Sequence, residues 1–162
     1  MPSLIALAVS VGVLAVVATW IFFLEPVAAA HLQVWQAFVA WGCHYQAGGK
    51  FTGTRNTVVC MSFGAVVGMA AGLLAGQLGA LGALAAPVAV GLGATVIVLS
   101  SKLPLLATIP ASVYGFASIA GLFLLGAGMT PTTSLLPTIL SIIIGAAFGF
   151  VSEAVAGALT KK

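Results

Sequence analysis

Long apolar runs, separated by short breaks of polar, glycine or proline residues, make up almost the whole chain. The breaks lie at residues 25–26, 48–55, 77–83, 102–104 and 126–133. Proline disfavours helix in the residue before it, and glycine often follows the end of a helix. The pattern predicts an all-α bundle of helices over residues 4–24, 28–47, 56–76, 84–100, 105–125 and 135–159. Each has about the 20 residues that a bilayer core requires.

The composition places these helices in a membrane. Hydrophobic residues make up 62% of the 162 residues, and charged residues only 4%, whereas soluble domains carry about 25% charged residues. So few charges cannot cover a surface that faces water, so we expect lipid around a single polytopic domain, residues 1–162. No basic stripe for nucleic acid is present. Residues 4–24 are too long for a signal-peptide core of about 15 residues and have no basic start, so we interpret them as the first span.

The positions of the basic residues predict the topology. If both termini are cytoplasmic, every basic residue lies in an inner loop or in the tail: Lys50, Arg55, Lys102, Lys161 and Lys162. This distribution follows the positive-inside rule. The second segment is the least hydrophobic, and a five-span alternative would omit it. Omitting it would divide the basic residues between the two sides, so the charge pattern favours six spans.

The sequence shows no convincing internal repeat. Two sets of three spans would have the odd number that an inverted pair requires. The similarity between the two halves is too weak for the sequence to predict such a pair.

Regularly spaced glycines predict close contacts between helices. Gly64, Gly68, Gly72 and Gly76 are four residues apart, so they share one face of the third span, and Gly145 and Gly149 repeat the spacing in the sixth. Small residues let the backbone of another helix approach closely. The alternative is that glycine is simply common in membrane helices. The partner helix belongs either to the same chain or to a second copy.

Polar faces on three spans predict where function lies. The second span has amide side chains on one face, the fifth has hydroxyl groups after a predicted kink or break at Pro110, and the sixth has a small, polar face. Such faces either pair with one another inside the bundle or line a hydrated path. The proposed substrate pathway comprises Gln36, Thr108, Ser112, Tyr114, Ser118, Thr138 and Ser141.

The ionisable residues lie near the ends of the spans. No Asp, Glu, Lys or Arg is expected at the middle of the membrane, which favours passive movement of a neutral or weakly charged solute. Residues that could act as a gate or respond to protons are Trp41, His44, Phe116 and Glu153. No nucleotide loop, catalytic triad or cluster of metal ligands is visible. We therefore expect no metal, no cofactor and no enzymatic activity.

A family resemblance rests on several short motifs. They are Phe38-x3-Gly42-Cys43 followed by Gly48-Gly49-Lys50, the third span with its glycines, and Pro110-x-Ser112-x2-Gly115. With these motifs the chain resembles the YcdZ-like family of small bacterial inner-membrane proteins, domain of unknown function 1097. The resemblance covers nearly the whole chain and implies a location in the bacterial inner membrane. It brings no activity and no functional residues.

Three hypotheses follow for function. The leading one is a homo-oligomeric channel or facilitator for a small polar solute or ion, acting passively. The alternative is a non-transporting scaffold or accessory subunit, in which the polar faces only pair. A third is an ion-coupled transporter that uses His44 or Glu153. The number of subunits and the identity of the solute stay open.

Overall fold

The computed structural model describes residues 1–126 and 128–160, and these residues form helices without any strand. This confirms the all-α expectation. The α-helices are α1 (Ser3–Phe22), α2 (Glu25–Ala29), α3 (Val34–Gln46), α4 (Lys50–Gln77), α5 (Ala85–Ser100), α6 (Ile109–Leu125) and α7 (Leu135–Thr160). Two 3₁₀-helices, η1 (Gly79–Leu84) and η2 (Pro104–Leu106), precede α5 and α6.

The number of full-length spans is smaller than the sequence predicts. Four helical segments are long and apolar enough to cross a membrane: Ser3–Phe22, Lys50–Gln77, Gly79–Ser100 and Leu135–Thr160. Helix α6 is apolar but has 17 residues. The predicted second span is interrupted, because the chain leaves α2 through His31, whose φ is 57°, before α3 begins. At a rise of 1.5 Å per residue, the 13 residues of α3 reach only about 20 Å, less than the ~30 Å hydrocarbon core.

Of the two outcomes predicted at Pro110, a kink or a break, the structure has the break. Helix α6 begins at Ile109, so Pro110 lies in its first turn. The first amides of a helix have no intrahelical acceptor, and the missing N–H of proline therefore costs nothing there. Residues 105–125 form a short 3₁₀ turn followed by a helix, and the proline starts that helix.

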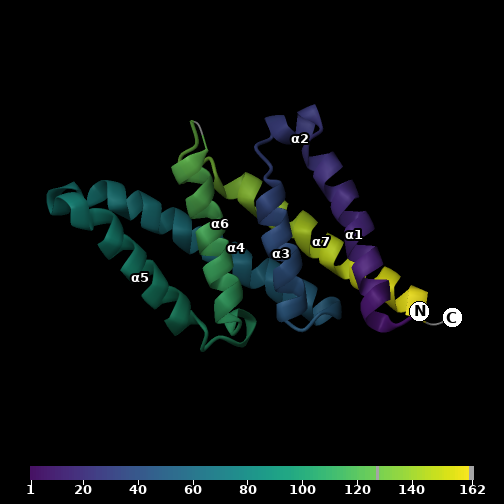
Figure 1. Ribbon diagram of the computed structural model, residues 1–162. Helices are drawn as coiled ribbons and strands as arrows, with labels where there is room; N and C mark the ends of the chain where they lie inside the picture. The colour runs from purple at the N-terminus through teal and green to yellow at the C-terminus, as the bar shows by residue number, and fades with distance from the viewer. Residues whose placement is uncertain (127, 161–162) are drawn as a thin grey trace.

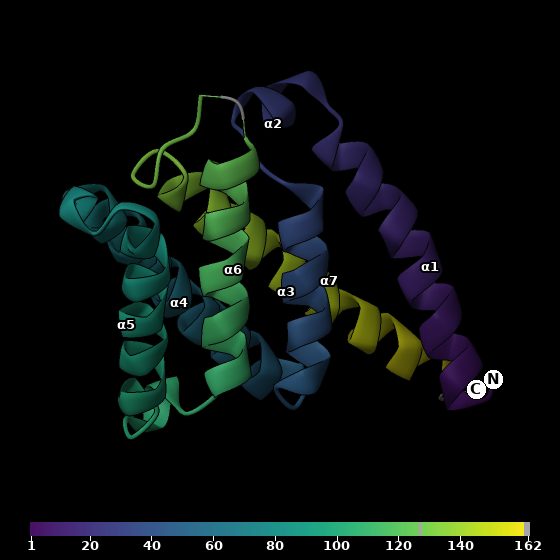
Figure 2. The same cartoon turned by 60° about the vertical axis from the view of Figure 1, so that its left-hand side comes forward.

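The helices pack in two similar groups. Helix α3 lies along α7 and α6 lies along α4, while α1 packs against α7 and α5 packs against α4. Helices α4 and α7 also contact each other. The two ends of the chain lie together at one end of the bundle, as do the α3–α4 turn and the α5–α6 connection (Figures 1 and 2). Lys50, Arg55 and Lys102 belong to this end, and Lys161 and Lys162 lie outside the described residues.

Glycines stand where the helix backbones approach one another. A Cβ atom at Gly64 would overlap the carbonyl oxygen of Ser112, and one at Gly115 would overlap that of Met61, across the α4–α6 contact. In the same way, a Cβ atom at Gly145 would overlap the carbonyl oxygen of Ala37 in α3. Gly76, in contrast, has no other atom within 4 Å. The two ends of the predicted glycine series thus differ in their surroundings.

Alanine substitution at the two ends of that series should have opposite effects. Gly64→Ala should lower the free energy of unfolding by about 1–3 kcal/mol, the usual cost of an overpacked core. Gly76→Ala should leave it unchanged or raise it by up to about 1 kcal/mol, because alanine is the better helix former. Unfolding in mild detergent, followed by denaturant titration, measures both. Equal stability of the two variants would contradict the packing described here.

Candidate functional site

A buried amide near the start of α3 joins three helices. Gln36 of α3 is fully buried, and its Nε2 donates hydrogen bonds to the carbonyl oxygen of Ser118 in α6, at 2.9 Å, and to Oγ1 of Thr138 in α7, at 3.1 Å. Polar groups away from water are costly unless they are hydrogen-bonded. The amide therefore fixes the relative positions of α3, α6 and α7.

Five buried side-chain polar atoms have no hydrogen-bond partner among the described residues. They are Oε1 of Gln36, Oγ1 of Thr57, and Oγ of Ser112, Ser118 and Ser134. An unpaired buried polar atom costs about 1–3 kcal/mol, and native proteins rarely leave several together. Since Gln36 Oε1 can only accept hydrogen bonds, the site suits a group that donates them. The hydroxyl groups can donate or accept.

The predicted pathway residues divide into an inner and an outer group. Gln36, Ser112, Ser118, Thr138 and Ser141 are all buried. Ser141 Oγ is already engaged, because it accepts a hydrogen bond from the backbone N–H of Gln33, at 3.0 Å.

Two of the other predicted residues lie elsewhere. Thr108 is half-buried just before α6, and the exposed fraction of Tyr114 is 37%, so its side chain faces outward. Phe116, a predicted gate, is also half-buried and lies on the side of α6 that faces α5, against Gly93. The inner group is therefore the candidate site.

Trp41 belongs to a second polar cluster, which joins α1, α3 and α7. Its Nε1 donates to Oγ of Ser152 at 2.9 Å, and Ser10 Oγ donates to the carbonyl oxygen of Ser152 at 2.8 Å. The indole also stacks on Phe148, with 5.5 Å between ring centroids. Trp41 is thus fixed by neighbours on two sides, as expected of a residue that packs helices together.

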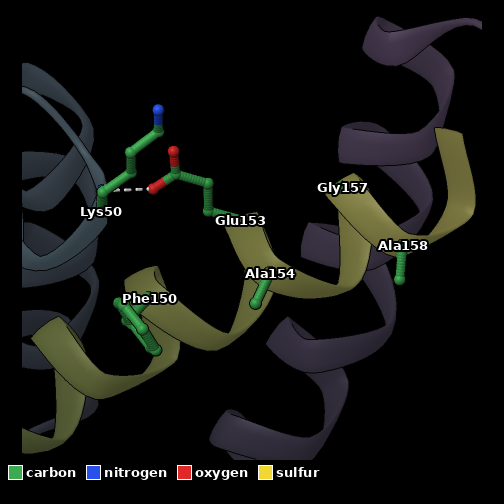
Figure 3. A pocket seen from close by; sticks show the side chains of 6 residues that line it. All are labelled: Lys50, Phe150, Glu153, Ala154, Gly157 and Ala158. Carbon is green, nitrogen blue, oxygen red and sulfur yellow. Dashed lines mark hydrogen bonds between the residues drawn. The ribbon is translucent and has the colours of Figure 1, made fainter. Parts of the chain in front are cut away.

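The two residues predicted to respond to protons form a pair at the end of the bundle that holds the chain termini. His44 Nε2 lies 3.1 Å from Oε2 of Glu153, and the same oxygen accepts a hydrogen bond from the backbone N–H of Lys50, at 2.6 Å. Figure 3 shows the carboxylate reaching from α7 to the start of α4. Thr54 Oγ1 lies 3.2 Å from the other ring nitrogen, Nδ1. We refer to the link between Glu153, His44 and Lys50 as the Glu153 contact.

The backbone of the α3–α4 turn is adapted to this contact. Gly48, Gly49 and Lys50 all have positive φ, at 110°, 66° and 51°. Glycine adopts this region without the steric cost that other residues meet. A Cβ atom at Gly49 would also lie 2.9 Å from Oε2 of Glu153. The Gly48-Gly49 pair therefore both makes the turn and leaves room for the carboxylate.

An open hollow of about 500 Å³ adjoins the Glu153 contact. Its walls come from α7 and the start of α4: Lys50, Phe150, Glu153, Ala154, Gly157 and Ala158 (Figure 3). The side chain of Glu153 is 33% exposed, whereas that of His44 is fully buried. The described residues contain no group of three His, Cys, Asp or Glu side chains that could hold a metal ion.

One inner residue, Thr57, was missed in the sequence. It follows the polar loop that ends at Arg55, and it precedes the glycine series of α4, so neither pattern included it. Thr138, which accepts a hydrogen bond from Gln36, was predicted because it lies on the small, polar face of α7.

Removal of the carboxylate should loosen the α3–α4 turn. Glu153→Ala leaves the N–H of Lys50 without its acceptor and should lower the free energy of unfolding by about 1.5 kcal/mol, the low end for hydrogen bonds to charged groups. Hydrogen exchange of residues 47–54 should accelerate as well. Glu25→Ala, at an exposed carboxylate that starts α2, serves as the control and should change neither. Unaltered exchange in both variants would show that the Glu153 contact does not hold the turn.

The comparisons with known proteins give a family and no activity. The family described as Protein of unknown function (DUF1097) matches residues 8–157, nearly the whole chain. No curated protein and no solved structure matches.

Proposed function

Because this chain belongs to the DUF1097 family, whose function is unknown, we propose a function from the geometry of the chain: passive movement of a small, uncharged polar solute across a membrane. The observation that carries the proposal is the set of buried polar atoms that have no partner among the described residues, Oε1 of Gln36 among them. The apolar helices indicate a membrane protein. A polar site deep in such a protein is usually functional.

The chemistry of the site defines the class of solute. Gln36 Oε1 accepts a hydrogen bond, and the hydroxyl groups of Thr57, Ser112 and Ser118 donate or accept. No charged side chain belongs to this group, so nothing there offsets the cost of removing an ion from water. A small neutral molecule with N–H or O–H groups, such as urea, a short amide or a polyol, fits these partners.

The location and the assembly are part of the proposal. The basic residues Lys50, Arg55 and Lys102 lie at the end that holds both termini, which fits a cytoplasmic position for that end. The family resemblance supports a bacterial inner membrane. Large exposed apolar side chains cover α1 and α5, so a second copy or lipid would cover these helices. We propose a homo-oligomer in which each chain carries its own site.

One observation favours the alternative of a non-transporting scaffold. Gln36, Thr138 and Ser141 are completely buried, and Gln36 and Ser141 are hydrogen-bonded within the bundle. In a scaffold the amide would simply tie three helices together. A solute pathway requires the unpaired hydroxyl groups as hydrogen-bond partners of the solute, whereas a scaffold does not require them.

Removal of the unpaired hydroxyl groups separates the two functions. Ser118→Ala and Thr57→Val each delete a hydroxyl group that has no partner, so they should preserve or raise stability. If a solute uses these groups, flux of urea, acetamide or glycerol into proteoliposomes should fall about tenfold, the equivalent of one hydrogen bond of ~1.4 kcal/mol. Thr95→Val, at an exposed site on α5, is the matched control and should leave flux unchanged.

Gln36→Leu tests the centre of the site. It should abolish flux, with Gln46→Leu at the exposed end of α3 as its control, and gel filtration should verify that both proteins fold. Folded wild-type protein that moves none of the three solutes would refute the proposed function.

A further inference from the structure

The packing of the helices relates the first half of the chain to the second. Helices α1, α3 and α4 form one set, and α5, α6 and α7 form the other. Helix α1 packs on α7 as α5 packs on α4, and α3 packs on α7 as α6 packs on α4. Helices α4 and α7, which are counterparts, contact each other between the two sets. The same helix contacts result when α1, α3 and α4 are interchanged with α5, α6 and α7.

The contacts agree residue by residue. Gly64 of α4 contacts Ser112 of α6, and Gly145 of α7 contacts Ala37 of α3. Gly145 lies 81 residues after Gly64, and Ser112 lies 75 residues after Ala37. The same two shifts relate the next turn, where Gly68 meets Ile119 and Gly149 meets His44. Both turns of each helix pair therefore share the same two shifts.

The sequences of α4 and α7 show the same correspondence. At the shift of 81 residues, six positions are identical: Thr57 and Thr138, Gly64 and Gly145, Ala65 and Ala146, Gly68 and Gly149, Ala75 and Ala156, Gly76 and Gly157. Eight of the nine buried residues of α4 have a buried counterpart at this shift. Val67 is the exception, because its counterpart Phe148 is half-buried.

Apart from the short α2, each set has three α-helices, an odd number, so the second set runs opposite to the first. Figures 1 and 2 show α1 leaving the end that holds both termini and α5 returning toward it. Inverted repeats of this kind allow the two sets to exchange conformations around a central site. We propose that the chain is an inverted repeat of three plus three helices, and that it opens the Gln36 site to one end of the bundle at a time. The second part of this proposal rests on the proposed function.

The two ends are closed by corresponding contacts of different chemistry. At one end the Glu153 contact joins α7 to the α3–α4 turn. The counterpart of Glu153 is Gly72 of α4, and a Cβ atom there would lie 2.9 Å from Pro131 and 3.0 Å from Phe123, which flank the α6–α7 connection. We refer to this as the Gly72 contact. One end therefore holds hydrogen bonds to a carboxylate, and the other holds an apolar contact.

The repeat is broken where the solute would bind. Gln36 donates to Thr138, but the counterpart of Gln36 is Ala111, so no amide is available for Thr57, the counterpart of Thr138. This accounts for the unpaired Oγ1 of Thr57. We expect an N–H group of the solute to donate to Oγ1 of Thr57, as the Gln36 amide donates to Oγ1 of Thr138.

Two thiol reporters can follow the two ends separately. Cys43 lies one residue before His44 of the Glu153 contact, and its counterpart Ser118 lies one residue before Ile119, which packs on Gly68, one turn from Gly72; both are 1% exposed. One protein carries C60S and keeps Cys43, and the other carries C43S, C60S and S118C. The rate of reaction with a small hydrophilic maleimide, measured by mass spectrometry, reports the opening of each end.

Weakening one contact should open that end and close the other. With E153A, or the milder E153Q, labelling at position 43 should rise about tenfold and labelling at position 118 should fall; F123A, or the milder F123L, should do the reverse. Phe51→Ala, at an exposed site, should change neither rate. Rates that rise together at both positions, or that do not respond to any of these variants, would overturn the proposal.

This readout is separate from that of flux. If the two labelling rates change in opposite directions but none of the tested solutes moves, the result supports the alternate opening of the two ends and rejects the proposed solute class. Flux without opposed labelling would reject the exchange and indicate a fixed channel.

Discussion

The structure depends on one constraint: polar groups inside an almost uncharged chain must find their partners within that chain, because the surrounding lipid offers none. The chain satisfies most of this need by bringing helix backbones together at glycines, which places side chains such as Gln36 within reach of two neighbouring helices. Close backbone packing and buried hydrogen bonds are therefore linked. A few buried polar atoms, those of Thr57 and Ser118 among them, have no partner among the described residues, and these are the atoms to which we assign solute binding.

The same constraint explains the end of the bundle near Glu153. A carboxylate close to the membrane needs donors, and the α3–α4 turn supplies the N–H of Lys50 together with the ring of His44. Glycines with positive φ let the turn come close enough to do so. At the corresponding place in the other half there is no charge, and Gly72 simply makes room for Pro131 and Phe123. The two halves therefore make different contacts at corresponding places: the Glu153 contact at one end of the bundle and the apolar Gly72 contact at the other.

Much of this could be predicted from the sequence, and the failures have physical causes. Hydrophobic runs gave the order of the helices, since lipid-facing segments have little freedom in composition. The interruption at His31 was missed because hydropathy does not register a single residue with positive φ. The sequence left open whether Pro110 kinks or breaks its helix, because a proline inside an apolar run and a proline at a helix start look alike until η2 is known.

The pairing of His44 with Glu153, and the repeat itself, were beyond the sequence. Both residues were selected as candidates, but their contact depends on how α3 crosses α7, which no local pattern encodes. The repeat was hidden because α3 has no residue identical to its counterpart in α6: Ala37 corresponds to Ser112, and Trp41 to Phe116. Only the contacts of Gly64 and Gly145 revealed the shift that aligns the halves.

The central claim is that buried polar atoms without partners, Oε1 of Gln36 and Oγ1 of Thr57 among them, bind a small neutral solute, and a high-resolution structure in lipid with urea or acetamide present tests it most directly. We expect density for a molecule within hydrogen-bond distance of Gln36 Oε1 or of Thr57 Oγ1, and its loss when the solute is omitted. A dry site, in which these atoms pair with protein groups and no further density appears, would contradict the account.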